Sequence, residues 1–169
     1  MTDAMTADKQ TVFVGVRGTI RCDEPMANHT SWKVGGPARY FFEPRDRKDL
    51  SAFLKELDPE VPILWLGLGS NLLVRDGGFD GAVIAAHRGL RELRDLGEGR
   101  FAVEAGVSCA RFSRFSAKLG WSGGEFLAGV PGTMGGALAM NAGAFGSETW
   151  SLVEEVELVN RAGSFENRP

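Results

Sequence analysis

Apolar residues in the first half of the chain recur with two different periods. ARYFF (38–42) predicts a strand that Pro44 ends, and VPILWL (61–66) and GAVIAA (81–86) predict two further buried strands. Asp46 is a candidate N-cap for an intervening helix. One apolar face of that helix, at helical spacing, consists of Leu50, Phe53, Leu54 and Leu57. Strand, helix and strand with a short crossover predict a parallel sheet.

A second unit follows a charged stretch at 87–100, which we interpret as a solvated face or hairpin. FAVEAG (101–106) alternates as a strand, and Ser108 is a candidate helix cap. The apolar face of that helix is expected to carry Cys109, Phe112, Phe115 and Leu119. A last alternating strand at 152–160 leads into the turn RAG (161–163). The sequence ends with SFENRP (164–169), and we expect the return strand of this hairpin to be missing. We therefore expect a natural fragment or a deliberately shortened chain.

Composition excludes some classes of function. The 169 residues are 43% hydrophobic and 24% charged, which is ordinary for a soluble globular protein. A net charge of −3 gives no support for a nucleic-acid partner. Cys22 and Cys109 have no metal-ligand spacing, so we expect reduced thiols, one in a strand and one near a helix start, and no metal site.

No membrane or export segment is predicted. The N-terminal ten residues are polar and lack the apolar run of a signal peptide. Residues 126–146 carry no charge, but Pro131, Thr133, Asn141 and several glycines would leave backbone groups unpaired in lipid. We therefore expect a cytoplasmic protein.

Glycine is the compositional outlier, with 23 residues. In the stretch GLGSN, Gly67 and Gly69 lack Cβ atoms, so a charged ligand can approach the backbone. Successive N–H groups there can form an anion nest, and Ser70 and Asn71 add side-chain donors. This pattern predicts a pyrophosphate cradle. It is neither a P-loop nor a Rossmann loop, because LLVRDGGF (72–79) indicates strand and turn rather than helix. An ordinary Gly-Ser hairpin is the alternative.

A second glycine-rich segment, 124–146, strengthens the cradle interpretation. Pro131-Gly132 predicts a turn before a short helix at 133–140, whose start would present the N–H groups of Thr133 and Met134 to an anion. Gly135 and Gly136 would leave one side of the helix bare for a flat ring. Small groups and one amide at the mouth of the site would come from Asn141, Ala142 and Gly143. The alternative is tight helix packing by small residues.

Three motifs in this order resemble the UDP-N-acetylenolpyruvoylglucosamine reductase (MurB) family. They are HTSWKVGGPARYFFEP (29–44), LGLGSNLLVRDGGFDGAVI (66–84) and AGVPGTMGGALAMNAGAFG (128–146). The resemblance implies an α+β fold, the FAD-binding fold of the vanillyl-alcohol oxidase and p-cresol methylhydroxylase (PCMH) type, with two α+β lobes. It implies an N-terminal tail at 1–18, a first FAD-binding lobe at 19–90 and a second at 91–169 that is incomplete at its C-terminus. It further implies that the substrate-binding domain is not part of this chain.

The resemblance also assigns site residues. It implies that the FAD pyrophosphate is held by Gly67, Gly69, Ser70 and Asn71. The second lobe would line FAD with Val130, Pro131, Gly132, Gly135, Gly136 and Ala137, and would bring Asn141, Ala142 and Gly143 close to the flavin. Thr30 and the Gly35-Gly36 turn match a motif interpreted as mainly structural. The family's catalytic residues lie beyond Pro169, so no catalytic role is assigned within this chain.

The activity that the resemblance implies is a flavin-dependent reduction in peptidoglycan biosynthesis. NADPH reduces FAD, and the flavin then reduces UDP-N-acetylglucosamine enolpyruvate to UDP-N-acetylmuramate, a step tied to cell shape and cell division. We expect FAD, NADPH and this UDP-sugar as partners, with no nucleic acid, membrane or obligate protein partner. The alternatives are a non-catalytic flavin-binding or scaffold module and another oxidoreductase of the same fold.

Three other side chains invite a functional interpretation. His29 lies at the start of the first motif, and we expect a hydrogen-bonding loop residue rather than a flavin attachment site. Trp32 and Trp65 are expected in the core rather than as stacking groups.

Overall fold

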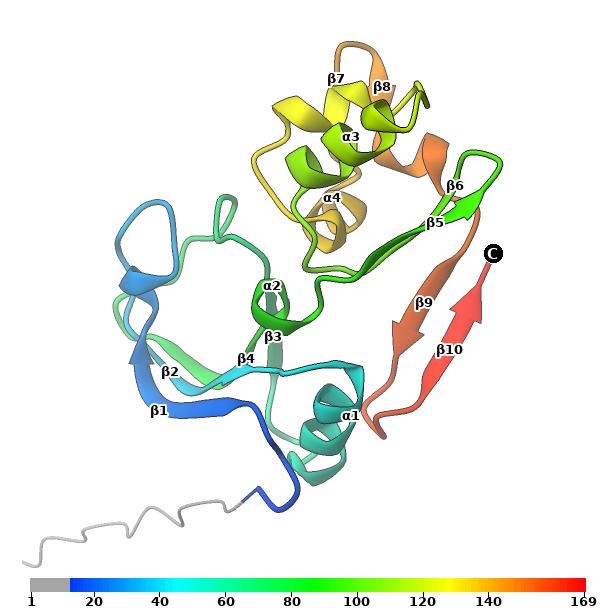
Figure 1. The fold of residues 1–169 in the computed structure, drawn as a ribbon. Helices are drawn as coiled ribbons and strands as arrows, with labels where there is room; N and C mark the ends of the chain where they lie inside the picture. The colour runs from blue at the N-terminus through cyan, green and yellow to red at the C-terminus, as the bar shows by residue number, and fades with distance from the viewer. Residues whose placement is uncertain (1–12) are drawn as a thin grey trace, which may run out of the picture.

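The computed structural model describes residues 13–169, which form two lobes (Figure 1). We call the four-stranded sheet with α1 the sheet lobe, and the elements from β5 to the 3₁₀ helix at Thr149–Leu152 the helical lobe. Part of the predicted N-terminal tail, residues 1–12, lies outside the described residues.

The sheet lobe confirms the predicted parallel sheet. Its strands are β1 (Thr19–Pro25), β2 (Pro37–Glu43), β3 (Ile63–Leu66) and β4 (Phe79–Ala85). Their order is β1-β2-β4-β3, with β4 parallel to both β2 and β3 and with β1 antiparallel to β2. The carboxyl ends of β2, β3 and β4 therefore meet at one edge, where ligands usually bind in open α/β sheets.

Helix α1 (Arg47–Glu56) covers one face of this sheet. The Asp46 carboxylate accepts a hydrogen bond from the Asp49 backbone N–H, which confirms the expected N-cap. All four predicted apolar positions of the helix are buried, and Phe53 stacks on Phe42 of β2 with ring centroids 4.1 Å apart. The opposite face of the sheet is covered by Met26, from the 3₁₀ helix Met26–Asn28, and by Val74, from the loop after β3.

Alternation along the central strands explains why both faces can be buried. In β4, Ala82 and Ile84 face α1, whereas Val83 and Ala85 pack with Phe41 on the other side.

The short α2 (Ala86–Gly89) and the hairpin of β5 (Leu93–Gly97) and β6 (Arg100–Val103) follow, which confirms a hairpin within the charged stretch.

The helical lobe contains two α-helices with short connecting elements. They are α3 (Cys109–Lys118), α4 (Met134–Met140), β7 (Gly143–Ala144), β8 (Ser147–Glu148) and the 3₁₀ helices Glu125–Gly129 and Thr149–Leu152; a further 3₁₀ helix, Met26–Asn28, belongs to the sheet lobe. Ser108 caps α3 by accepting a hydrogen bond from the Arg111 N–H, as expected. The lobe's core consists of Cys109, Phe126, Leu127 and Ala137.

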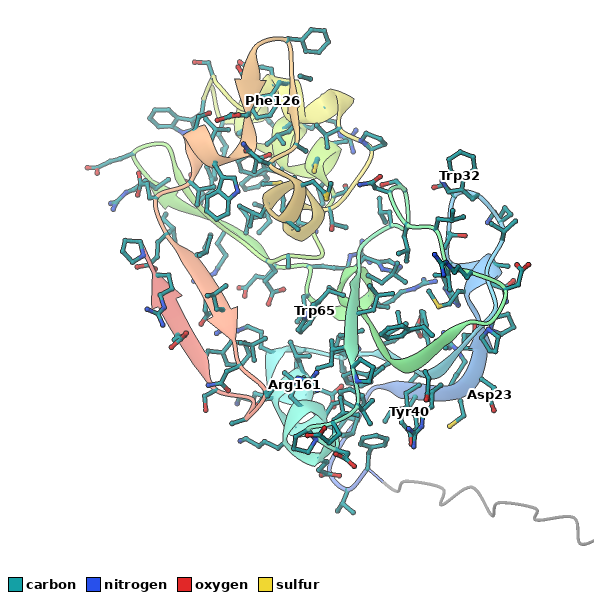
Figure 2. All side chains as sticks on the ribbon, turned by 180° about the vertical axis from the view of Figure 1, so that it is seen from behind. Asp23, Trp32, Tyr40, Trp65, Phe126 and Arg161 are labelled. Carbon is teal, nitrogen blue, oxygen red and sulfur yellow. The ribbon has the colours of Figure 1, made fainter. Side chains whose placement is uncertain are left out.

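The last two strands, β9 (Val156–Val159) and β10 (Phe165–Arg168), form a hairpin that lies beside α1 of the sheet lobe (Figure 1). The expectation of a missing return strand is therefore wrong, because residues after the turn at 161–163 pair with β9. The Ser51 hydroxyl donates to the Gly163 carbonyl at 2.7 Å. Arg161, labelled beside α1 in Figure 2, donates to the Val61 carbonyl at 2.7 Å. The chain therefore returns to its first lobe after building its second.

Some local expectations are wrong. Trp32 and Trp65 are 69% and 47% exposed rather than in the core, because Trp32 lies in a surface loop (Figure 2) and Trp65 on the edge strand β3. Leu119 is 45% exposed, because α3 instead buries the face of Cys109, Ser113 and Ser116. Residues 72–74 run without a strand partner, although the predicted absence of a helix is confirmed.

Candidate functional site

The two glycine-rich bends lie against each other across the two lobes. A Cβ atom added to Gly67, at the end of β3, would lie 2.6 Å from Oγ1 of Thr133. One added to Gly132 would lie 3.8 Å from Oγ of Ser70. The bends therefore approach within van der Waals distance, and a ligand held by one of them would also contact the other.

The GLGSN loop presents a row of hydrogen-bond donors without partners. Within residues 13–169, the backbone N–H groups of residues 68–71 have no acceptor, and neither the Ser70 hydroxyl nor the Asn71 amide has a partner. Unsatisfied donors in a bend are suited to phosphate oxygens. The residues present thus fit the pyrophosphate of a dinucleotide such as FAD, as the sequence predicts.

Gly69 is required by the shape of this loop. Its φ is +70°, and an added Cβ would lie 2.0 Å from the His29 carbonyl oxygen. Ser31 N–H donates to the Gly69 carbonyl at 2.9 Å. Residues 26–36 therefore form a support behind the cradle.

The same support fixes the far end of the loop. Gly36 N–H donates to the Arg75 carbonyl at 3.0 Å, and an added Cβ at Gly36 would lie 2.0 Å from the Asp76 carbonyl oxygen. Thr30 is buried, and its hydroxyl donates to the Val34 carbonyl at 3.1 Å. These contacts confirm the structural interpretation of Thr30 and the Gly35-Gly36 turn.

The start of α4 differs in part from the expectation. Thr133 caps the helix, its hydroxyl accepting from Gly136 N–H at 3.3 Å, and its own N–H has no partner in the described part of the chain. Met134 N–H, however, donates to the Val107 carbonyl at 2.8 Å, so it is not available to an anion as expected. The Thr133 side chain also faces Gly67 of the other bend, a contact that the sequence pattern does not predict. The signal for its role as the cap was a threonine at the N-cap position.

The two helical glycines have different surroundings. An added Cβ at Gly135 would lie 2.8 Å from the Cβ of Ala105, so this glycine permits close packing of α4 on the loop after β6. The packing alternative therefore accounts for Gly135. At Gly136 the nearest atom to an added Cβ is Thr133 Oγ1 at 3.6 Å, so this position is open to a ligand.

The remaining predicted residues of the second lobe surround α4. Pro131 is exposed and Val130 half-buried at the bend, whereas Ala137 lies in the core. Asn141, at φ +44°, ends α4, and its amide is occupied by the Glu148 carboxylate at 3.0 Å and Trp150 N–H at 3.1 Å. The Ala142 carbonyl accepts from Thr149, and Gly143 lies against the Ser147 carbonyl within the β7–β8 hairpin.

The histidines and cysteines are arranged as ordinary structural groups. His29 Nε2 hydrogen bonds with Glu24 at 2.7 Å and its ring stacks on Phe41, which confirms the predicted hydrogen-bonding role. Cys22 and Cys109 are free thiols, one in β1 and one at the start of α3, as expected. Burial raises the pKa of the Cys109 thiol, so it is protonated at neutral pH.

Comparison with known proteins assigns the family. The model of a family described as "FAD binding domain" matches residues 38–167. The chain belongs to this FAD-binding domain family. A UDP-N-acetylenolpyruvoylglucosamine reductase of Methylococcus capsulatus is 56% identical over 147 residues, covering 87% of this chain and 48% of the relative. One of Legionella pneumophila (strain Lens) is 53% identical over 152 residues, covering 90% of this chain and 49% of the relative.

A solved structure agrees with this assignment. The crystal structure of the MurB enzyme from Thermus caldophilus matches with a TM-score of 0.67 and 30% identity, covering 90% of this chain and 52% of that chain. The predicted α+β FAD-binding fold of the PCMH type is thereby confirmed. The chain spans about half the length of the curated relatives it matches. Among the helices described in residues 13–169, none has the length and apolar character needed to cross a membrane.

Proposed function

We propose that this chain is the FAD-binding part of a UDP-N-acetylenolpyruvoylglucosamine reductase. The observation that carries the proposal is the approach of two glycine-rich bends from different lobes, one of them lined with unpartnered donors. Identities of 50–56% to reductases of this name support it. In the proposal, residues 19–90 and 91–169 are the two FAD-binding lobes, and β9–β10 crosses back to the first.

The proposed contacts with FAD divide between the two bends. The backbone N–H groups of residues 68–71, with Ser70 and Asn71, donate to the pyrophosphate oxygens, and Gly67 and Gly69 give the backbone its close approach. From the second bend, Val130, Pro131, Gly132 and Gly136 line the cofactor. Gly135, Ala137, Asn141, Ala142 and Gly143 shape α4 and its exit near the flavin.

Bound FAD supplies hydride transfer, and the protein supplies binding and orientation. Through the loop after β3, the sheet lobe holds the anionic middle of the cofactor rigidly, because residues 26–36 brace that loop from behind. Thr133 lies against Gly67, so the two bends are in direct contact at this point. The proposed whole-protein reaction is the NADPH-dependent reduction of UDP-N-acetylglucosamine enolpyruvate to UDP-N-acetylmuramate in the cytoplasm. It would serve peptidoglycan synthesis, and with it cell shape and division, without an obligate protein partner.

Titration of the purified chain with FAD tests the binding part of this proposal. We expect quenching of flavin fluorescence with a one-to-one endpoint, and no reductase turnover, because the family's catalytic residues are expected beyond Pro169. A chain that fails to quench flavin fluorescence would contradict the FAD site. Turnover by the chain alone would contradict the expected position of the catalytic groups.

The reaction is tested on a reductase that contains this chain and has the full length of its curated relatives. Under anaerobic conditions NADPH should bleach the flavin absorbance, and the enolpyruvyl UDP-sugar should restore it. A flavin that bleaches and ignores this substrate would identify another oxidoreductase of the same fold. A flavin that NADPH does not bleach would point to a non-catalytic flavin-binding module.

A further inference from the structure

Helix α3 carries a row of positive charge on its exposed face. Arg111, Arg114 and Lys118 are all exposed, and they follow one another at spacings of three and four positions. Because an α-helix turns by about 100° per residue, these side chains leave the helix within a sector of about 60°. That sector lies opposite Cys109 and Ser116, which face the core of the lobe. We call these three cations the basic stripe.

No carboxylate compensates the basic stripe. Within residues 13–169, none of its three side chains has an ion-pair partner, whereas Arg94 and Arg100 of the neighbouring hairpin each pair with a glutamate, at 3.1 Å and 3.6 Å. The Arg111 guanidinium donates to the Arg91 carbonyl at 2.8 Å, which fixes one end of the stripe. The stripe is therefore a local excess of positive charge in a chain whose net charge is −3.

This arrangement of charge is unfavourable for the helix itself. Like charges three and four positions apart repel each other, and Arg111 lies in the first turn, where a cation opposes the helix dipole. The first turn of α3 contains no acidic residue, whereas α1 has Asp49 in its first turn and Lys55 in its last. Since α1 follows the usual rule and α3 departs from it, the departure indicates a role for the stripe other than helix stability.

Two exposed apolar side chains extend the stripe beyond the end of α3. Leu119 is 45% exposed and Trp121 is 42% exposed. Gly120, at φ +84°, turns the chain so that Trp121 N–H donates back to the Ser116 carbonyl at 3.1 Å. The Trp121 ring also lies against the turn between β5 and β6, where a Cβ added to Gly99 would be 3.1 Å from it. The tryptophan is therefore held in place beside the end of the stripe.

A protein surface fits this combination better than a lipid or a nucleic acid does. Tryptophan and arginine are both enriched in protein–protein interfaces. Helices that bind at a membrane surface insert their apolar face into the lipid, but the apolar face of α3 is already buried in the core around Cys109 and Leu127. A net charge of −3 gives no support for a nucleic acid.

We propose that the basic stripe, together with Leu119 and Trp121, is a docking surface for an acidic segment of another protein. The stripe extends over about 10 Å of the helix axis. The segment that fits it is a short helix whose carboxylates have the same spacing and whose end carries an apolar side chain. Charge complementarity supplies the attraction, and the two apolar side chains determine the register. The inference does not depend on the FAD site.

The probe is a synthetic alanine-rich helical peptide with glutamates at positions i, i+3 and i+7 and a leucine at i+11. Its binding is followed by fluorescence anisotropy, and a peptide with glutamines in place of the glutamates is the matched probe. The site variant is Arg114→Gln with Lys118→Gln. The control variant is Lys48→Gln with Lys55→Gln, which removes two exposed cations from α1. Loss of two exposed ion pairs predicts binding weaker by about tenfold in the site variant, and no change in the control.

A second readout separates docking from a structural role. Arg114→Gln relieves repulsion within α3, so it should unfold at the temperature of the unaltered chain or above it while binding the glutamate peptide more weakly. A lower unfolding temperature would identify Arg114 as a structural residue and overturn its assignment to the docking surface. For the unaltered chain, added salt should weaken binding of the glutamate peptide, and binding that salt does not change would contradict the electrostatic basis of the proposal.

The remaining arms identify a different partner. Co-sedimentation of the unaltered chain with vesicles of phosphatidylcholine and phosphatidylglycerol, without binding of the glutamate peptide, would assign the stripe to a membrane and overturn the proposal. The peptide titration is repeated on a reductase that contains this chain and has the full length of its curated relatives. Loss of binding there would show that the rest of the reductase covers the stripe. Equal affinities of the site and control variants would also overturn the proposal.

Discussion

Gly67 and Thr133 face each other across the two lobes, with space between them for no more than a hydrogen atom on the glycine. A Cβ on Gly67 would lie 2.6 Å from Thr133 Oγ1 and 3.3 Å from its methyl carbon. Thr133 is itself held by its cap on α4 and is only 2% exposed. The pair therefore sets how closely the two bends approach.

We expect Gly67→Ala to force these bends apart and to lower the free energy of unfolding by about 1–3 kcal/mol, as overpacking does. Thr133→Ala alone should cost about 1 kcal/mol through the lost cap. In the Thr133→Ala background the added cost of Gly67→Ala should largely vanish, because the clashing hydroxyl is gone. Urea unfolding of the four proteins measures this coupling, and strictly additive costs would contradict the contact.

Gly69→Val should abolish retention of FAD. Valine strongly disfavours a φ of +70°, and its Cβ would lie 2.0 Å from the His29 carbonyl oxygen, so the loop must rearrange. Gly77→Ala is the matched control, because Gly77 lies in the same connection with no atom within 4 Å of an added Cβ. The measurement is flavin content after purification. A Gly69→Val protein that retains its full flavin would show that the cradle is wrongly assigned.

Asp49 is a buried carboxylate that joins the beginning of β1 to the end of β2. It is 1% exposed and accepts backbone N–H bonds from Arg17 at 2.6 Å and Arg45 at 2.7 Å. Asp49→Asn replaces one acceptor oxygen by a donor, and leaving a buried N–H unpaired should cost about 1–3 kcal/mol of unfolding free energy. Asp80→Asn, at an 89% exposed side chain, should change it by less than about 0.5 kcal/mol. If the Asp49→Asn and Asp80→Asn proteins unfolded at the same urea concentration, this result would contradict the role of Asp49 as a buried hydrogen-bond acceptor.

His87 should make stability depend on pH just below neutrality. Burial, with a smaller contribution from Arg88, lowers the pKa of His87 below its ordinary value of 6.5, against the opposing effects of the Leu66 backbone and Glu43. The unfolded chain therefore binds this proton more readily than the folded chain. The stabilising contribution is present above pH 6.5 and is lost as the pH falls through the folded pKa.

His87→Gln should accordingly reduce the loss of unfolding free energy between about pH 6.5 and pH 5. Urea unfolding at several pH values measures the slope. Lys48→Gln provides the comparison, because Lys48 is an exposed residue of α1. A His87→Gln protein with the slope of the unaltered chain would show that His87 does not titrate differently on folding.

The sequence correctly predicted the elements whose formation depends on residues that are close together along the chain. Asp46 and Ser108 each cap the helix that was expected, and the apolar spacing of Leu50 and Phe53 identified the buried face of α1. The loop after β3 was predicted to continue without a helix, and it does. These features depend on residues within a few positions of one another.

Features that depend on distant partners were not predictable in the same way. Trp65 is exposed because β3 is an edge strand, which only the pairing order β1-β2-β4-β3 determines. Met134 N–H is occupied by Val107, and Gly135 faces Ala105, because α4 docks against a segment almost thirty positions earlier. The motifs thus indicated a phosphate site, whereas the division between contact residues and packing residues required the tertiary structure.

The return of β9–β10 to α1 links the ends of the described chain mechanically. Arg47 lies over Phe165 at 4.5 Å and pairs with Glu157, and the Ser51 hydroxyl donates to the Gly163 carbonyl, so two residues of one early helix anchor a late hairpin. The two lobes are therefore joined at two places, through α2 and through this hairpin. Loss of β9–β10 would therefore remove one of the two links that fix the position of the second bend relative to the first.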